Sequence, residues 1–308
     1  MGPGSGFGKT ILFGEHFVVY KTPGIAAALD LATDAHVLKT NSGGLQIEDL
    51  RKGAPGYVES KQEMQQQSLL RIFKHLGIGA KDVKIRLSGS LPAFSGIGAS
   101  GASCVAIIRA LSSEFGLNLT DDQVNEAAHE GERAYHGENT AGIDNMASTF
   151  GGLIFFRKGN PSYVEHLKLK KPLEIIIADT GITANTKVMI EGVLKRKLKN
   201  SKKYDRLIQT AQEVIEKGKQ ALLNFDLEML GSLMNENHHL LQEIEVSCKE
   251  LDFLVELARS AGAFGAKQTG SGGGGCIVAL TPGKDLQAKV ARTVEEKGFA
   301  VLRTRIGI

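Results

Sequence analysis

The first ninety residues consist of short apolar runs separated by turn-forming residues, which is the pattern of β-strands. We expect these runs to pair into a largely antiparallel sheet. The predicted strands cover residues 10–20, 24–31, 35–40, 45–50 and 83–90. Residues 61–76 differ, because their apolar positions recur every three or four residues, and this spacing predicts a helix.

Helical spacing dominates the rest of the chain. Val105, Ile108 and Leu111 predict a helix that begins at or near Ser100, and Thr120 is the expected cap of the next helix. Because the strands of the second half are few and are separated by helices, the pattern favours an α+β fold over a barrel. Further helices are predicted at residues 186–197, 204–223, 227–243, 249–261 and 285–297, and strands at residues 151–159, 173–181, 275–280 and 299–306.

A chain of 308 residues, of which 42% are hydrophobic and 23% charged, is long enough for two globular domains. We place the boundary near Lys170, which gives domains of residues 1–170 and 171–308. The formal net charge is only +3, and the longest basic run, residues 195–206, falls on a helical pattern. We interpret that run as a solvated helix face and expect no nucleic-acid partner.

Three widely separated cysteines, Cys104, Cys248 and Cys276, show no metal-like pairing and favour a reduced, cytoplasmic protein. Apolar runs stay well short of the roughly 18 to 20 residues that a membrane helix needs. The N-terminus also lacks the apolar segment of a secretion signal. No membrane partner is therefore expected.

The stretch LPAFSGIGASGAS, residues 91–103, places three glycines directly before a predicted helix. It contains the pattern G-x-G-x-x-G, which suggests a dinucleotide site. Pro92 and Phe94 nevertheless separate the glycines from the preceding strand, and Asp121 opens a helix instead of ending a second strand. Both features disfavour a Rossmann site.

A Walker A loop is suggested by GSGFGKT near the N-terminus. Pro3 stands where that motif requires its first glycine, and a strand is predicted after Lys9, so we reject this interpretation. The physics common to both motifs remains: glycines let backbone N–H groups approach an anion, and the start of a helix favours negative charge. Residues 91–103 are therefore either a phosphate-binding turn or a tight connection without a ligand.

A second glycine run, KQTGSGGGGCIVAL, contains four consecutive glycines, Gly272 to Gly275. Each glycine costs about 0.5 to 1 kcal/mol of backbone entropy relative to alanine, which a mere connection would avoid. A flexible linker is the alternative, but the flanking segments AFGAK and CIVAL are too apolar for one. We expect something to approach this backbone closely.

Phosphoryl transfer from a nucleotide also needs a metal ligand and a group that orients the attacking alcohol. Lys9, Glu15 and His16 are candidates near the N-terminus, and Glu132 and Asp144 are candidates in the middle of the chain. Each has a structural alternative when taken singly: an exposed helix pair for Glu132, a helix cap for Asp144 and a partly buried core position for His16. Their chemistry becomes specific only in combination.

Together these segments resemble the GHMP kinases. The three motifs of that family occur in order, as GKTILFGEHFVVY, LPAFSGIGASGAS and KQTGSGGGGC, so the resemblance spans nearly the whole chain. Within the family, FGEHFVVY and HGENTAGIDNMASTFGG are most similar to the mevalonate kinases, whereas galactokinases normally continue GEH with Thr-Asp-Tyr. The subfamily assignment depends on those two segments.

The resemblance implies a two-domain α+β fold, with an N-terminal domain like domain 2 of ribosomal protein S5 and a ferredoxin-like C-terminal domain. It implies transfer of the γ-phosphoryl group of ATP to the 5-hydroxyl group of mevalonate, with Mg²⁺ as cofactor, by a cytoplasmic homodimer. Two alternatives stay open: another GHMP kinase, such as a phosphomevalonate kinase or a galactokinase, and a nucleotide-binding sensor without catalytic activity.

The resemblance also implies roles for individual residues. Asp144 would accept or orient the proton of the substrate hydroxyl, Lys9 would pair with Asp144, and Ser100 and Glu132 would bind Mg²⁺. The phosphates of ATP would contact Pro92, Ser95, Gly96, Ile97, Gly98, Ala99, Ser100, Gly101 and Ala102. Mevalonate would contact Glu15, His16, Thr186, Gly272 and Gly273.

The chain departs from the family pattern in three places. Gly6, Phe7 and Gly8 precede Lys9 where the family usually has Ala-Pro-Gly, and Ala99 replaces the first of two serines. The segment GENTAG before Asp144 is one residue longer than the common GNPSG. None of these changes removes a chemically required group.

Overall fold

The computed structural model describes residues 1–41, 43–53, 57–93, 96–138, 140, 142–159 and 162–307, with only the backbone described at 57–59. The chain forms two compact units. The first comprises Met1–Lys9, Leu29–Phe94 and Gly98–Gly151, and the second comprises Thr10–Ala28, Ser95–Ile97 and Gly152–Ile308. The predicted domains, residues 1–170 and 171–308, are continuous stretches of the sequence, whereas each compact unit is made of three segments. The predicted domain limits stay a prediction.

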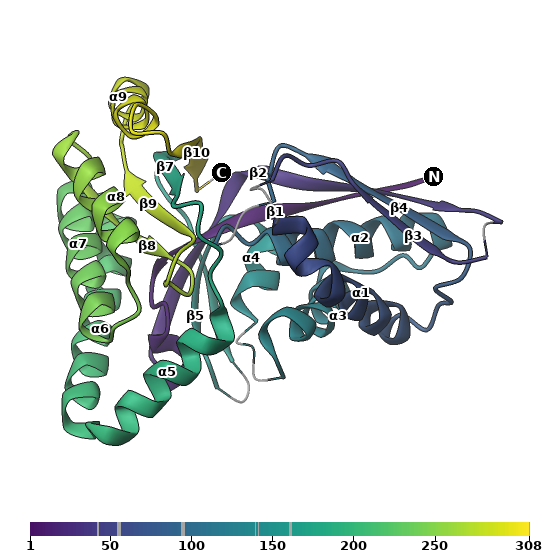
Figure 1. Cartoon of the computed structure of the whole chain (residues 1–308), viewed down its shortest axis with the longest axis horizontal. Helices are drawn as coiled ribbons and strands as arrows, with labels where there is room; N and C mark the ends of the chain where they lie inside the picture. Colours follow the sequence, from purple (N-terminus) through teal and green to yellow (C-terminus); the bar gives the residue numbers. More distant parts are fainter. Residues whose placement is uncertain are drawn as a thin grey trace. The chain divides into compact units, whose positions relative to one another are not determined.

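The first unit packs helices on a small sheet. Strand β4 (Val83–Gly89) lies between β3 (Leu45–Asp49), to which it is parallel, and β2 (Pro23–Lys39), to which it is antiparallel. β1 (Gly2–Phe13) also pairs with β2. The helices of this unit are α1 (Tyr57–His75), α2 (Ala99–Phe115), α3 (Asp121–His136) and α4 (Ile143–Phe150), and α1 to α3 lie along one face of β3 and β4 in Figure 1.

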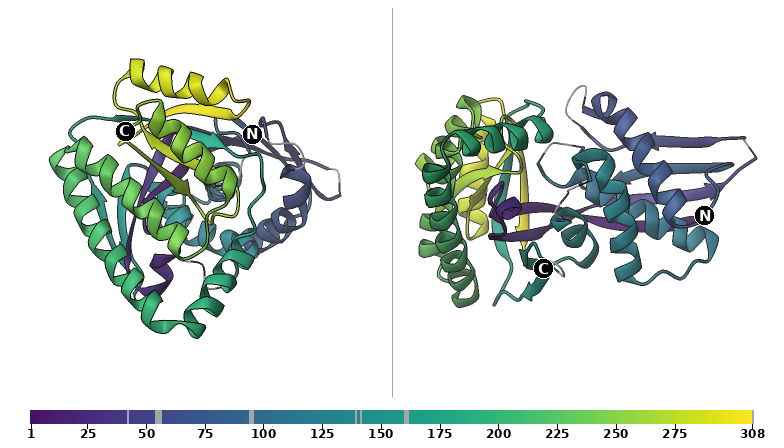
Figure 2. Two further views of the ribbon diagram at one scale, coloured as in Figure 1. Left: turned by 60° about the vertical axis from the view of Figure 1, so that its left-hand side comes forward. Right: turned by 90° about the horizontal axis from the view of Figure 1, so that it is seen from below.

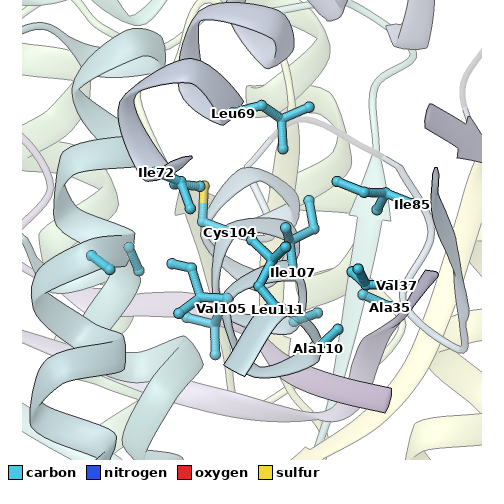
Figure 3. Close-up of a cluster of buried hydrophobic side chains, with 14 of the residues drawn as sticks. Ala35, Val37, Leu69, Ile72, Ile85, Cys104, Val105, Ile107, Ala110 and Leu111 are labelled. Carbon is cyan, nitrogen blue, oxygen red and sulfur yellow. The ribbon is translucent and has the colours of Figure 1, made fainter. Parts of the chain in front are cut away.

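The core of the first unit is apolar and is centred on α2. Figure 3 shows side chains of α2, among them Ile107, between those of α1 and those of the strands. Leu69 and Ile72 come from α1, and Val37 and Ile85 come from β2 and β4. Burial of apolar surface is the main favourable term in folding, so this cluster holds α2 against the sheet. The position of the first turn of α2 is fixed in this way.

β1 packs on α2 through glycines. A methyl group on Gly2, Gly4 or Gly6 would lie 2.3 to 2.4 Å from a carbonyl oxygen of α2, which is closer than any side chain allows. These glycines alternate along the strand and therefore share one face, while the oxygens, of Ala110, Ala106 and Ala102, are one helical turn apart. Direct contact with the backbone of α2 thus positions β1, and Lys9 is the last residue of β1 that belongs to this unit.

The second unit contains a four-stranded antiparallel sheet in the order β10-β7-β9-β8. Counted along the chain, this is the order 4-1-3-2 of a ferredoxin-like fold. Helices α8 (Lys249–Ser260) and α9 (Lys284–Glu295) share an apolar core with this sheet. The strands are β7 (Leu173–Asp179), β8 (Gly265–Thr269), β9 (Cys276–Leu280) and β10 (Ala300–Ile306).

Three further helices belong to the second unit: α5 (Thr186–Lys199), α6 (Ser201–Asn224) and α7 (Leu227–Glu243). The two long helices α6 and α7 run side by side, as the green ribbons of Figure 2 show. The start of β2 pairs here with β5 (Leu153–Arg157), which in turn pairs with β6 (Tyr163–Leu167).

The α+β architecture agrees with the sequence prediction, and most predicted elements end within a few residues of the observed ones. The predicted strand over residues 10–20 is wrong in its second half. β1 ends at Phe13, a turn follows, and Phe17–Tyr20 form a short 3₁₀ helix. The two predicted strands at 24–31 and 35–40 are one strand, β2. No helix among the described residues is long and apolar enough to cross a membrane.

Candidate active site

Lys9 and Asp144 form an ion pair in the first unit. Lys9 Nζ lies 3.0 Å from Asp144 Oδ1, and the Lys9 side chain is only 4% exposed. Asp144 lies in the first turn of α4, which follows Gly142 in a left-handed conformation. Burial would raise the pKa of Asp144, but Lys9 and His136 outweigh it and hold that pKa below its usual range. The longer turn before Asp144 therefore leaves a charged pair intact.

Glu132 lies next to this pair on α3, one turn before His136. Glu132 is fully buried, and its Oε2 lies 3.2 Å from Nε2 of His136, which is also 3.9 Å from Oδ2 of Asp144. Burial opposes a charge on the imidazole, but Glu132 and Asp144 outweigh that effect and raise the pKa of His136. Neither oxygen of Glu132, nor Nε2 of His136, has a hydrogen-bond partner among the residues that the structure describes, so the contact between these two side chains is an ion pair without hydrogen-bond geometry.

These three side chains form a cluster of metal-ligand type. One ligand atom each of Glu132, His136 and Asp144 lie within 4.8 Å of one another. At an effective dielectric constant of about 20, two carboxylates at such a spacing repel each other by about 3 kcal/mol. Positive charge must therefore accompany them, and Lys9 supplies part of it.

The predicted phosphate-binding turn leads into α2. Gly98 is left-handed, with φ of 70°, and α2 begins at Ala99 without a side-chain cap, so its first N–H groups keep their capacity to bind an anion. Gly101 and Ala102 are buried in the first turn, and Ser100 is half-buried there. In the second unit, Gly96 lies against the backbone of β8 and β9, and Ile97 is buried. Pro92 is buried, whereas Ser95 lies outside the described residues.

A small pocket adjoins the start of α2 in the first unit. Arg51 pairs with Asp49 on its wall, with Nη2 and Oδ2 2.6 Å apart, and donates from Nη1 to Thr33 Oγ1. Burial lowers the pKa of Lys61, so its ammonium group lacks full hydration. The lining residues are Asp49, Arg51, Lys61, Gln65, Ala93, Ala99, Ser100, Ser103 and Tyr135.

In the second unit, Ser271 connects two of the predicted substrate residues. His16 Nε2 donates to the Ser271 carbonyl oxygen at 2.7 Å, and Thr186 Oγ1 donates to Ser271 Oγ at 3.1 Å. Burial lowers the pKa of His16, so the ring is neutral near pH 7 and its Nδ1 is a hydrogen-bond acceptor. His16 has a φ of 61°, a strained value for a residue with a side chain, and such strain is concentrated at functional sites.

Glu15 forms a fully buried ion pair with Lys267 of β8. Lys267 Nζ also donates to the carbonyl oxygens of Gln268, at 2.7 Å, and Ile11, at 3.3 Å. Buried ion pairs of this kind depend on both partners, since removal of one leaves an uncompensated charge. The pair therefore anchors the backbone directly before His16 to β8, and a contact of Glu15 with substrate stays a prediction.

The glycines of the second run are required by neighbours in the same unit. A methyl group on Gly272 would lie 2.0 Å from the Val246 carbonyl oxygen, and one on Gly273 would lie 2.9 Å from Met189 Sδ. Gly273 also donates its N–H to Val246. The protein itself is what approaches this backbone closely, and contacts of Gly272 and Gly273 with a substrate stay a prediction.

Sequence reasoning missed His136, Ser271 and Lys267. His136 follows Glu132 by four residues, and that spacing on a helix could have placed the two on one face. Lys267 and Glu15 are 252 residues apart, so no local pattern relates them. Ser271 is one of many small residues in its segment, and the sequence gives no sign that it contacts His16.

Two family profiles match the chain. The profile described as GHMP kinases N terminal domain covers residues 65–152, and the one described as GHMP kinases C terminal covers residues 219–300. The mevalonate kinase of Thermococcus onnurineus (strain NA1) is 34% identical over 97% of this chain and 94% of its own length. The chain belongs to the GHMP kinase family.

Another relative and a solved structure support the same family assignment. The mevalonate kinase of Pyrococcus furiosus is 36% identical over 97% of this chain and 94% of its own. Among solved structures, that of L. major mevalonate kinase in complex with R-mevalonate is 36% identical, with a TM-score of 0.93, over 99% of this chain and 96% of that one. Both profile matches leave out four of the predicted site residues, namely Lys9, Glu15, His16 and Thr186. The similarity in those parts of the chain comes from the full-length relatives.

Proposed function

We propose that this GHMP kinase is a mevalonate kinase, which transfers the γ-phosphoryl group of ATP to the 5-hydroxyl group of mevalonate. The observation that carries the proposal is the likeness to L. major mevalonate kinase, which extends over 99% of the chain. A kinase uses a nucleoside triphosphate, and the charged pair, the glycine turn and the pocket described above supply the groups that such a reaction needs.

Asp144 is the residue that would orient the alcohol. Its low pKa keeps the carboxylate ionised at neutral pH, so it accepts a hydrogen bond from the 5-hydroxyl group. An ionised carboxylate of low pKa is a weak base, and we therefore expect it to take the proton late, once the forming P–O bond has made the hydroxyl acidic. Lys9 offsets negative charge on the transferred group.

The residues near Asp144 fit a magnesium ion. Mg²⁺ binds carboxylate and hydroxyl oxygens, and Glu132 offers the buried Oε1 while Ser100 offers a half-buried hydroxyl. When held by Glu132 and Ser100, Mg²⁺ would offset the negative charge of the phosphates. The N–H groups at the start of α2 would bind phosphate oxygens, and Lys61 in the adjoining pocket adds positive charge for the same nucleotide.

His16, Ser271 and Thr186 are the residues to which we assign mevalonate. The neutral His16 ring presents Nδ1, which can accept from a substrate hydroxyl. Because Thr186 donates to Ser271 Oγ, the Ser271 hydroxyl hydrogen points elsewhere and can donate to the substrate carboxylate. This pattern of one acceptor and one donor complements a hydroxy acid.

A substrate screen tests the proposal. ADP release would be measured with mevalonate, phosphomevalonate, galactose and homoserine at equal concentrations in the presence of ATP and Mg²⁺. We expect the highest kcat/KM with mevalonate. A higher value with one of the other acceptors would assign the chain to a different GHMP activity, and turnover of none would support a nucleotide-binding sensor. Sedimentation would test the predicted homodimer, while the cytoplasmic location stays a prediction.

A further inference from the structure

The roles proposed above for Asp144, Lys9 and the metal ligands leave none for His136. Its imidazole ring nevertheless lies close to the carboxylates of both Glu132 and Asp144. Its Nε2 is 3.2 Å from Glu132 Oε2 and 3.9 Å from Asp144 Oδ2. The imidazole side chain is 25% exposed, against 1% for Glu132, so the carboxylate is the more deeply buried of the two groups. None of the contacts proposed above for ATP or mevalonate requires a histidine at this position.

We propose that His136 is a positioning residue, which holds Glu132 by Oε2 so that Oε1 is left to bind the metal, and which keeps Glu132 and Asp144 at a fixed spacing. The inference rests on the proposed function. Three observations carry it: Oε2 is the oxygen of Glu132 that lies 3.2 Å from the ring nitrogen, both oxygens of Glu132 are buried without a hydrogen bond among the described residues, and the same ring nitrogen faces Asp144.

The physical reason is that a carboxylate ligand must be oriented before a metal arrives. Glu132 is the least exposed group of the cluster, and its χ angles have no other polar contact to fix them within the described residues. Groups that hydrogen-bond to a metal ligand typically change metal affinity by about 10- to 100-fold when they are removed. A role for His136 in orientation should therefore appear in Mg²⁺ binding rather than in binding of the acceptor.

Three substitutions test the inference, because they differ in where an N–H group is placed. In His136→Gln, the side-chain amide nitrogen is four bonds from Cα, as Nε2 of histidine is, whereas in His136→Asn it is one bond closer to the backbone. His136→Ala has no donor. Arg133→Gln is the matched control on the same helix, since Arg133 pairs with Glu130 and Glu138 and with neither cluster carboxylate.

The readout is equilibrium binding of a non-hydrolysable ATP analogue to the full chain, with Mg²⁺ titrated and no phosphoryl acceptor present. We expect the Mg²⁺ concentration for half-saturation to rise about tenfold in His136→Ala and His136→Asn, and to stay within about threefold of the parent in His136→Gln and Arg133→Gln. Analogue binding in EDTA should be unchanged in all four. The KM for mevalonate should also stay constant while kcat at limiting Mg²⁺ falls.

Equal effects of the Gln and Asn substitutions, or a loss of binding in EDTA as large as in Mg²⁺, would overturn the inference. If His136→Ala does not fold, as thermal melting would reveal, the Gln and Asn comparison still decides. Because no acceptor is used, the binding result stands even if the substrate screen assigns another alcohol to the enzyme. A failure of the proposed function and a failure of this inference are therefore distinguishable.

Discussion

Replacing Gly98 by alanine would disturb the Lys9–Asp144 pair without altering either residue. A methyl group at Gly98 would lie 2.5 Å from Lys9 Cγ and 3.2 Å from the Lys9 backbone nitrogen. Ordinary van der Waals contact begins at 3.4 Å, so the near end of the lysine side chain must move by about 0.9 Å. Because the side chain is 4% exposed, it has little free space in which to move.

The shift is large on the scale of the ion pair. Lys9 Nζ and Asp144 Oδ1 are 3.0 Å apart, and a displacement of about 1 Å would take them to the limit of a useful contact. Misplacement of reacting groups by about 1 Å costs roughly 100-fold in rate. The substitution also forces alanine into the left-handed region at φ of 70°, which costs about 1 to 2 kcal/mol of stability.

Gly116→Ala separates these two effects. Gly116 ends the same helix with φ of 68°, but a methyl group there would meet nothing within 4 Å. Urea unfolding should therefore show a similar loss of stability in both variants. Steady-state ADP release with saturating mevalonate and ATP should show a roughly 100-fold lower kcat in Gly98→Ala only. If kcat of Gly98→Ala stays within about threefold of that of Gly116→Ala, the alignment of Lys9 is not what limits turnover.

Three other outcomes are expected. Asp144→Asn should lower kcat by orders of magnitude while the dissociation constant of an ATP analogue hardly changes; near-normal turnover would remove Asp144 from the mechanism. Ser100→Ala should raise the Mg²⁺ concentration needed for half-maximal rate, and an unchanged requirement would point to another ligand. Burial lowers the pKa of His238 to about 4 from 6.5, although Asp252 opposes the shift. The unfolded chain therefore takes up a proton first, so up to about 3 kcal/mol of stability present above pH 6.5 is lost toward pH 4. Denaturation of His238→Gln at pH 7 and pH 4.5 should show a smaller loss than the parent, and an equal loss would refute this.

Elements with a regular period were predictable from the sequence, and elements without one were not. Thr120 caps α3 as expected, because a capping box depends only on residues three positions apart. Strand β8 escaped prediction since all of its residues are buried, Lys267 included, so no alternation of polar and apolar positions exists. Its charge is tolerated only because Glu15 neutralises it, which no local pattern reveals.

The site was predictable where the resemblance supplied residue identities. Lys9 and Asp144 are 135 positions apart, and only the family motifs suggested that they pair at all. The segment Gly6–Lys9 and the segment GENTAG depart from those motifs, yet the pair has ordinary geometry. Contacts that the motifs do not contain, such as that of His136 with two carboxylates, depend on how α3 meets α4 and required the three-dimensional structure.

The glycine face of β1 has a consequence for how this enzyme tolerates change. Gly2, Gly4 and Gly6 face the main chain of α2 and the Cβ atoms of Glu114, Arg109 and Val105, and they lead directly to Lys9. The contacts of these glycines with the helix are therefore made by main-chain and Cβ atoms, which every amino acid except glycine possesses. Substitutions that change the side chains of α2 and its core contacts should therefore leave Lys9 in the same position, as long as positions 2, 4 and 6 remain glycine.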